Sequence, residues 1–218
     1  SYKREDYPDL TDEEYANFRL VETTGMGSHL YRGSSPIQER LNRYMYIDKF
    51  LEKYKIKNII NLTDREEWQS KHKGYENSYY SKQNVLCLSL SVDMLSDRYK
   101  NGVRKALQFI IDNEPPYYVH CVEGQDRTGF FCGMLEFFMG ASFEEVVTDY
   151  MKTYDNYYGI KKGDQRYPYF ADDMIQVYER CFYTEPITNI DLKEASTNYF
   201  KELGFDDDAL EKLRQRLK

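Results

Sequence analysis

The chain has 218 residues, of which 41% are hydrophobic, and its 37 acidic and 30 basic side chains give a formal charge of −7. This length and apolar content allow a folded core and exclude wholesale disorder. The acidic balance argues against a nucleic-acid-binding protein, which carries a basic stripe, and no apolar run reaches the roughly 18–20 residues that a membrane helix needs.

Cysteine and histidine side chains are spread along the chain. The four cysteines include no C-x-x-C pair, and the three histidines stand apart from them. Metal sites need closely spaced ligands, and disulfide frameworks need more cysteines in a shorter chain. We therefore expect no metal, no cofactor, and free thiols in a reducing compartment. The residues concerned are Cys87, Cys121, Cys132, Cys181, His29, His72 and His120.

The first residues, SYKREDYPDL, contain no apolar stretch typical of a signal peptide. Because the chain begins with Ser, removal of a leader is also compatible with the sequence, so cytoplasmic and exported locations both stay open. Residues 1–28 are polar and aromatic, which predicts an N-terminal arm wrapped on the fold.

The next elements follow from periodicity. Compact β-branched runs predict buried strands, apolar residues at helical spacing predict helices, and polar stretches predict loops. The prediction for the first half is a strand at 30–32, a turn at 33–36, a helix at 39–54, strands at 56–62 and 84–90, and a loop with a short helix at 63–83.

Apolar residues in 99–113 follow the i, i+3, i+4, i+7, i+8 pattern of an amphipathic helix. Pro115 and Pro116 end this helix, and 117–119 is a third predicted strand. The helix that starts at Arg127 is apolar nearly all round, as expected in the middle of a domain.

A capping box at Ser142 begins a further helix, and the last predicted helices cover 168–182, 191–203 and 206–217. Strands that alternate with helices, followed by a helical part at 141–218, indicate an α/β fold with the sheet between helices. We expect one compact unit over 1–218.

The segment 119–129, VHCVEGQDRTG, joins the third strand to the apolar helix. Backbone N–H groups of such a loop and of the first helical turn converge and bind an oxyanion. Gly124 permits a positive φ and close approach, and Arg127 offers a planar fork to two phosphate oxygens. The expected phosphate-binding residues are Val122, Glu123, Gly124, Gln125, Asp126, Arg127 and Thr128.

Cys121 is the candidate nucleophile. Inward N–H groups and a guanidinium favour the thiolate, which would attack the atom whose oxygens the loop holds. His120 is expected to orient the loop through backbone hydrogen bonds, and the Thr128 hydroxyl to stabilise the thiolate when it leaves.

Cys-x5-Arg-Thr between a strand and a helix resembles the signature loop of the cysteine-based protein tyrosine phosphatases, including the dual-specificity group. Residues 30–36 and 56–62 are similar to the opening strands of atypical dual-specificity enzymes, and 146–151 and 199–217 to helices of bacterial tyrosine/lipid phosphatases. The resemblance implies a central, mostly parallel sheet of four to five strands flanked by helices, with extra C-terminal helices. It also implies phosphomonoester hydrolysis through a cysteinyl-phosphate, with phosphotyrosine or mixed protein targets first.

Such enzymes need a carboxylic acid that protonates the leaving oxygen and later activates water. In the family this aspartate usually lies on a loop upstream of the cysteine, which favours Asp93 over Asp97. Asp126 is also a candidate, because Gly-Gln-Asp-Arg-Thr resembles the myotubularin and related loops, in which that aspartate is given the acid role.

The substrate stays open between a phosphorylated protein and a phosphorylated small molecule or lipid. Phosphoinositide-directed relatives carry Lys where this chain has Gln125, and Glu123 is nearby, so a polyanionic head group is disfavoured. Cations that could compensate are Arg65, Arg98, Lys100, Lys161 and Lys162. The sequence is also compatible with an inactive phosphate-binding module and, more weakly, with a sulfur-transfer or arsenate-reducing enzyme.

Two further residues receive structural roles. Arg32 is expected to anchor its turn by an internal ion pair rather than to touch substrate. Cys87 is expected in the core, on a central strand.

Overall fold

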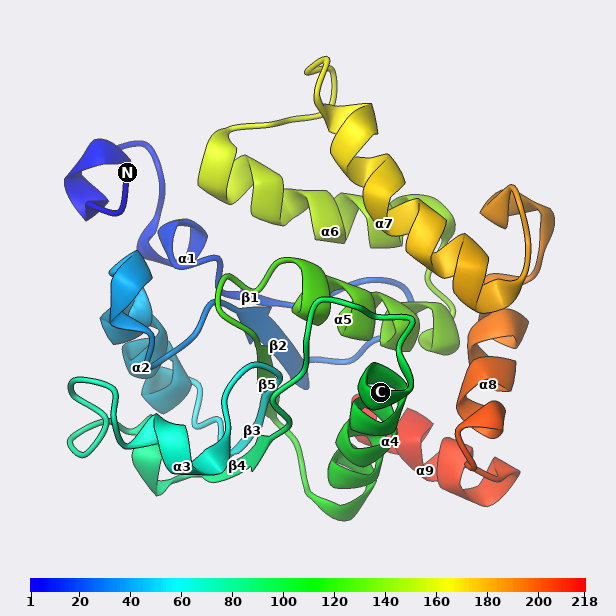
Figure 1. The fold of residues 1–218 in the computed structure, drawn as a ribbon, viewed down its shortest axis with the longest axis horizontal. Helices are drawn as coiled ribbons and strands as arrows, with labels where there is room; N and C mark the ends of the chain where they lie inside the picture. The colour runs from blue at the N-terminus through cyan, green and yellow to red at the C-terminus, as the bar shows by residue number, and fades with distance from the viewer.

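The computed structural model describes residues 1–218. A five-stranded sheet with the order β1-β2-β5-β3-β4 lies at its centre (Figure 1). The strands are β1 (Arg19–Leu20), β2 (Leu30–Gly33), β3 (Asn58–Asn61), β4 (Asn84–Cys87) and β5 (Tyr117–His120). Only β1 is antiparallel to its neighbour. The mostly parallel sheet that the resemblance implied is therefore confirmed.

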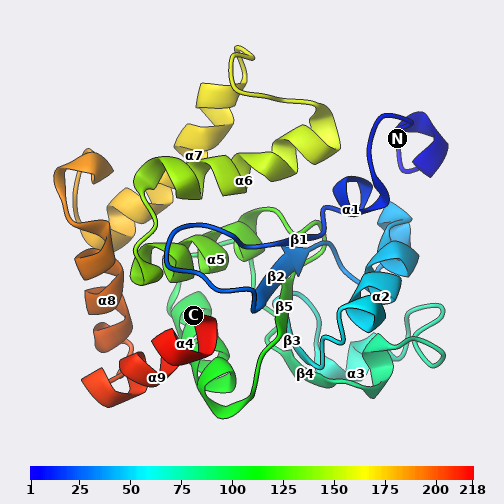
Figure 2. The ribbon, with the colours of Figure 1, turned by 180° about the vertical axis from the view of Figure 1, so that it is seen from behind.

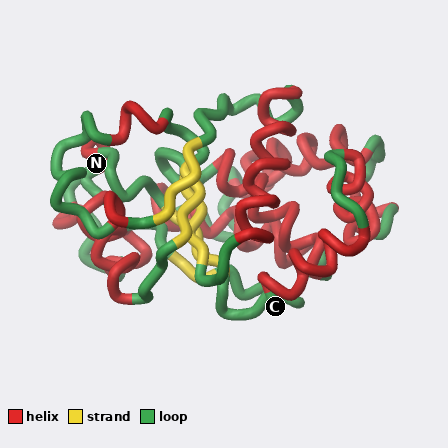
Figure 3. The backbone as a smooth tube through the Cα atoms, turned by 90° about the horizontal axis from the view of Figure 1, so that it is seen from below, coloured by secondary structure: helices red, strands yellow, loops and turns green.

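β5 occupies the middle of the sheet, between β2 and β3. Side chains alternate between the two faces of a strand. Accordingly, Ile60 and Val119 join a core of 38 buried residues on one face, and Ile59 and Tyr118 join a cluster of 10 on the other. Figure 3 shows the strands between two unequal halves, with the longer helices on one side and mostly loops and short helices on the other.

The helices fall into two groups by position in the chain. α1 to α3 lie on the side of the smaller cluster, and α4 to α9 on the side of the larger core (Figures 1 and 2). Their bounds are α1 (Asp12–Tyr15), α2 (Tyr44–Lys53), α3 (Glu66–Gln69), α4 (Asp97–Asp112), α5 (Asp126–Met139), α6 (Phe143–Tyr158), α7 (Tyr167–Phe182), α8 (Leu192–Glu202) and α9 (Asp207–Leu217).

α5 is the central helix of the larger half. It contacts β5, α6 and α8, and residues on all its sides are buried, among them Phe130, Phe131 and Phe138. An all-round apolar helix is stable only when neighbours cover every face. Its N-terminal turn is consequently fixed directly behind the end of β5.

The C-terminal helices pack on this core. α8 lies against α5, and α9 lies against α4 (Figure 2). Leu210, Leu213 and Leu217 form one buried face of α9, and the carboxylate of Asp206 accepts a hydrogen bond from the Ala209 N–H, which caps the helix. No helix of the fold combines the length and the apolar character needed to cross a membrane.

Two local predictions were wrong, at 39–54 and at Cys87, and one segment contains short elements that were not predicted. The helix predicted at 39–54 is a 3-10 turn, Glu39–Leu41, followed by α2, because Asn42 takes the left-handed conformation with φ 55° and interrupts it. The N-terminal arm contributes α1 and the edge strand β1, both too short to leave a periodic pattern. Cys87 lies on the edge strand β4 and is half-buried, because no further strand covers that side.

Candidate active site

The segment around Cys121 lies at the carboxyl edge of the parallel strands. β5 ends at His120, the loop occupies 121–125, and α5 begins at Asp126. Ligand sites of parallel sheets lie outside this edge. Cys121 is buried at the start of the loop.

Every backbone carbonyl from Cys121 to Gln125 accepts a hydrogen bond from a residue outside the loop. The donors lie in several segments, from the residues before β1 to the end of α6. Together they hold the peptide groups of the loop in one orientation. They are His120 Nδ1 to the Cys121 oxygen, the Ser35 N–H to Val122, Asn17 Nδ2 and the Tyr157 hydroxyl to Glu123, Arg32 Nη2 to Gly124, and the Gly129 N–H to Gln125.

The N–H groups of the loop point the other way. In a planar trans peptide the N–H is antiparallel to the preceding C=O, so carbonyls held outward turn the N–H groups of Val122 to Asp126 inward. None of the N–H groups from Val122 to Thr128 donates to a protein acceptor. The loop is therefore a set of preoriented donors at a helix N-terminus, which is an oxyanion site.

Gly124 is the residue that this geometry requires to be glycine. Its φ is 71°, and a Cβ at this position would lie 2.2 Å from the Gly33 carbonyl oxygen. The loop thus crosses directly over the end of β2. The expectation of a positive φ and a close approach at Gly124 is met.

Arg127 is anchored by the two loops that follow the neighbouring strands. Its Nη1 donates to Thr63 Oγ1 at 3.1 Å and to the Leu90 carbonyl oxygen at 2.8 Å. The Tyr99 hydroxyl donates to the Arg127 carbonyl at 2.7 Å. These contacts fix the position of the guanidinium beside the loop, while Nε and Nη2 make no hydrogen bond to the protein and remain available to a phosphate.

His120 is neutral at physiological pH. Complete burial lowers its pKa to about 4, although the hydrogen bond to the Cys121 carbonyl at 3.0 Å acts in the opposite direction. Because a carbonyl only accepts, the proton is on Nδ1. The buried Thr128 hydroxyl, at the first turn of α5, has no protein partner.

The two candidate acids have different surroundings. Asp126 is half-buried, and its Oδ1 accepts a hydrogen bond of 2.8 Å from the Tyr150 hydroxyl on α6. Asp93 is exposed in the β4–α4 loop, and its Oδ1 accepts from the Leu95 N–H at 3.2 Å within that turn. The same loop contains Leu90, the contact of Arg127. Asp97 begins α4.

A buried charge network supports the loop from behind. Arg32 Nη1 pairs with Asp149 Oδ2 at 2.6 Å, and Arg19 Nε pairs with Asp149 Oδ1 at 2.8 Å. Burial acts to raise the pKa of Asp149, but the two arginines hold it at about 2. Burial and the Asp149 charge raise the pKa of Glu136 far above its ordinary value. Glu136 is therefore a neutral acid, and the internal ion pair expected for Arg32 is confirmed.

Sequence reasoning missed most of the residues that hold the loop. Asn17, Thr63 and Tyr99 come from segments with no motif, and their contacts span long sequence separations. Tyr150 lies inside the 146–151 match to bacterial phosphatase helices, and Tyr157 lies in a tyrosine-rich run that is visible in the sequence. The family match and the tyrosine-rich run were visible in the sequence, but neither predicted that these tyrosines hold the loop.

Comparison with known proteins identifies the family of this chain. The model of the "Tyrosine phosphatase family" matches residues 40–218, and no curated protein matches the chain. Among solved structures, the chain is similar to the core catalytic domain of the PP-IP phosphatase SIW14 from S. cerevisiae in complex with citrate. That likeness has 20% identity and a TM-score of 0.46, and it covers 75% of this chain and 91% of the other.

A second structure, titled as the Siw14 catalytic core, has 19% identity and a TM-score of 0.44, and covers 75% of this chain and 90% of the other. The family model begins within the β2–α2 connection and covers the Cys121–Arg127 loop and all the C-terminal helices. The chain belongs to the tyrosine phosphatase family and is a cysteine-dependent phosphatase.

Proposed function

We propose that this protein hydrolyses phosphate monoesters with Cys121 as nucleophile and Arg127 as phosphate clamp, and that phosphotyrosine in proteins is its first substrate class. The single observation that carries the proposal is the ring of N–H groups from Val122 to Thr128, which donate to no protein acceptor. These donors and one guanidinium match the non-bridging oxygens of a phosphoryl group in a trigonal transition state.

The reaction takes two steps. The Cys121 thiolate attacks phosphorus, the bond to the ester oxygen breaks, and an aspartic acid gives that oxygen its proton. Water then attacks the cysteinyl-phosphate, the aspartate accepts a proton from that water, and the phosphorus–sulfur bond breaks. The Thr128 hydroxyl, which has no other partner, donates to the departing thiolate. His120 keeps the Cys121 carbonyl turned away from the phosphate throughout.

Asp126 has the better support as the acid, although the sequence favours Asp93. Its carboxylate lies at the first residue of α5, directly after the loop, and is oriented by Tyr150. Asp93 is exposed and its carboxylate accepts from its own turn, so it would act only after the β4–α4 loop moved. General acid catalysis contributes about 10²–10⁴ in rate, so Asp126→Asn should lose that factor and Asp93→Asn much less.

The surroundings of the loop favour a single aryl phosphate. Gln125 and Glu123 contribute no positive charge. Tyr158, which is 53% exposed, packs its ring against Tyr157, whose hydroxyl donates to the Glu123 carbonyl. An exposed aromatic ring beside the loop suits a phenyl ring. Phosphoserine and phosphothreonine, the further targets of a dual-specificity enzyme, offer no ring for this contact.

A polyphosphorylated substrate, such as an inositol phosphate or a phosphoinositide, is the second candidate. Arg65 follows Thr63 in the β3–α3 connection, and Arg98 Nη2 donates to the Ser89 carbonyl at 2.6 Å, next to Leu90. Thr63 and Leu90 are the anchors of Arg127. Two exposed arginines therefore flank the clamp and would bind additional phosphates.

The first experiment is hydrolysis of para-nitrophenyl phosphate in EDTA by the wild type and Cys121→Ser. We expect turnover that disappears in the variant. Activity that survives in Cys121→Ser would overturn the assignment of the nucleophile, and an inactive, folded wild type across pH 5–8 would favour a phosphate-binding module.

The second experiment compares kcat/KM for a phosphotyrosyl peptide, a phosphoseryl peptide and an inositol hexakisphosphate. We expect the order phosphotyrosyl, phosphoseryl, inositol phosphate. The double variant Arg65→Gln/Arg98→Gln should leave the peptide rates nearly unchanged. Preference for the inositol phosphate, lost in this double variant, would establish the second candidate instead.

A further inference from the structure

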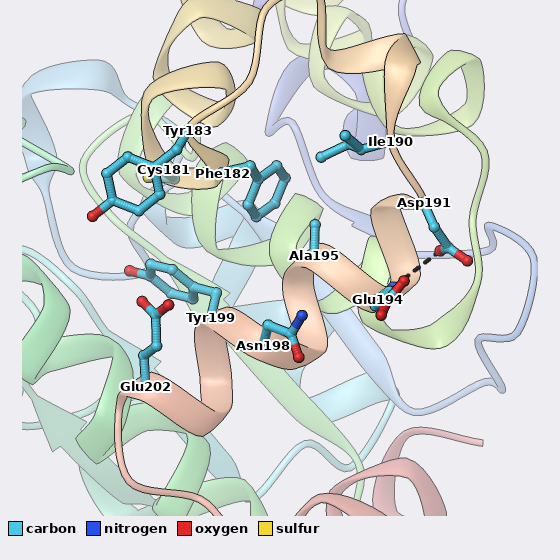
Figure 4. A pocket seen from close by; sticks show the side chains of 10 residues that line it. All are labelled: Cys181, Phe182, Tyr183, Ile190, Asp191, Glu194, Ala195, Asn198, Tyr199 and Glu202. Atoms are coloured by element: carbon cyan, nitrogen blue, oxygen red, sulfur yellow. Dashed lines mark hydrogen bonds between the residues drawn. The ribbon is translucent and has the colours of Figure 1, made fainter.

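A cleft of about 390 Å³ lies between the C-terminal end of α7 and one face of α8. Figure 4 shows Phe182 and Tyr183, at the end of α7, above it and the residues of α8 below. None of its lining residues belongs to the Cys121 loop. The volume is within the range of small-molecule sites, about 300–1,000 Å³.

Tyr199 is the buried polar residue of this cleft. It is 5% exposed, yet its hydroxyl has no hydrogen-bond partner. Buried hydroxyl groups are normally paired, because an unpaired one costs about 1–3 kcal/mol. Burial first, and Cys181 and Glu202 to smaller degrees, raise the Tyr199 pKa, so the phenol stays protonated. Figure 4 shows its oxygen at one end of the cleft, together with the Tyr183 hydroxyl and the Glu202 carboxylate.

The opposite end of the cleft is also acidic. Asp191 and Glu194 lie there, and Asp191 uses one oxygen to cap the Glu194 N–H at 3.0 Å. Neither residue forms a salt bridge, and Glu202 forms none. Because α8 rises about 1.5 Å per residue, Glu194 and Glu202 are separated by about 12 Å along its axis.

No protein cation neutralises these carboxylates. Burial raises the pKa of Cys181 to about 12, although the positive charge of Lys100 acts to lower it. The Cys181 thiol is therefore neutral and adds no charge to the cleft. The C-terminal end of α7, at Phe182, carries the negative end of its helix dipole. The unpaired carboxylates and the end of α7 favour a bound cation, whereas the charge of Lys100 acts against it.

We infer that this cleft binds a linear aliphatic polyamine, with ammonium groups at the Tyr199–Glu202 and Asp191–Glu194 ends and methylenes against Phe182. The unpaired Tyr199 oxygen would accept a hydrogen bond from one ammonium, and the 84% exposed ring of Tyr183 would cover it by a cation–π contact. The acidic ends, about 12 Å apart across an aromatic centre, match two charges joined by an apolar chain.

A basic polypeptide segment fits this cleft less well. The walls are formed by the ends and faces of two helices, so they offer no strand edge to an extended chain. Its recognition would depend on side chains alone.

The test is isothermal titration of the full chain with spermidine at low ionic strength. We expect one saturable site. Because each exposed ion pair is weak, Glu202→Gln and Glu194→Gln should each weaken binding about two- to fivefold, and the double variant about tenfold. Tyr199→Phe should weaken it by a similar single factor without losing the fold, which thermal unfolding would verify.

Glu52→Gln on α2, at the far side of the molecule in Figure 1, is the matched control for charge and should bind as the wild type does. Absence of saturable binding, or equal weakening by Glu52→Gln, would overturn the inference. Butylamine, with a single ammonium group, should bind at least tenfold more weakly, and equal binding would contradict a two-ended site. Saturable binding of a tetralysine peptide without spermidine binding would assign the cleft to a basic polypeptide instead.

Discussion

Arg32 and Gly124 are joined by a buried hydrogen bond of 3.0 Å, from a guanidinium nitrogen of β2 to a carbonyl oxygen of the Cys121 loop. The other terminal nitrogen of Arg32 pairs with Asp149 on α6 at 2.6 Å. The conformation of the Cys121 loop is therefore tied to an ion pair that lies behind it, between β2 and α6. A planar, bidentate guanidinium is the only side chain that makes both contacts at once.

Replacement of Arg32 by lysine should reduce both stability and turnover. The lysine ammonium retains the charge but loses one of the two directed contacts. We therefore expect the free energy of unfolding, measured in urea, to fall by about 2 kcal/mol. The rate constant for para-nitrophenyl phosphate should fall about a hundredfold, because the loop donors shift. Arg19→Lys also disturbs Asp149 but leaves the Gly124 carbonyl untouched and reaches the loop only indirectly, through Asn17, so a similar stability loss with a smaller loss of turnover is expected. Equal kcat values for the two variants would contradict this role of Arg32.

Gly124→Ala should abolish most activity. The added Cβ would lie 2.2 Å from the Gly33 carbonyl oxygen, so either the loop or β2 must move. The matched control is Gly159→Ala, which has a similar φ of 65° but nothing within 4 Å of the new Cβ. The control should lose only about 1 kcal/mol of stability and keep its turnover. Steady-state kinetics and urea unfolding of both variants separate a steric effect at the loop from a general cost of positive φ.

Tyr150→Phe should lower kcat through Asp126. The variant removes the hydroxyl that donates to Asp126 Oδ1 at 2.8 Å and leaves the buried ring in place. We expect a loss of about tenfold in kcat with little change in KM, because the carboxyl group loses its orientation rather than the substrate its contacts. In the Asp126→Asn background the same change should have almost no further effect. Full additivity of the two losses would mean that Tyr150 does not act through Asp126.

His120 should make the protein less stable in mild acid. Its folded-state pKa of about 4 lies below the unfolded value of 6.5, so the unfolded state binds the proton first. This contribution to stability is complete above pH 6.5, and it is lost as the pH falls toward 4. At pH 5 the loss is about 2 kcal/mol.

The measurement is urea unfolding of the wild type and His120→Asn at pH 7 and pH 5. The amide of the variant can still donate to the Cys121 carbonyl but does not titrate. Glu136 has a raised pKa and acts in the opposite direction, because its neutral form gains stability as the pH falls toward its unfolded value of 4.5. That effect is common to both proteins and cancels in their difference. The same pH dependence in both proteins would show that His120 is not the responsible group.

The sequence by itself determined the features that depend on neighbours along the chain. Amphipathic and apolar periodicity identified α4 and α5, and the strand–loop–helix pattern around Cys121 identified the family and predicted an oxyanion loop. These signals are local because a helix face repeats within four residues and the loop places its nucleophile, donors and clamp within seven.

Only the tertiary structure decided what holds that loop and which strands meet. The donors to its carbonyls are separated from it by as many as 106 residues, as with Asn17 and Glu123. The order β1-β2-β5-β3-β4 places Cys87 at an edge and brings Thr63 and Leu90 to Arg127. Such contacts leave no periodic trace, because each one depends on the direction of a single side chain in the finished fold.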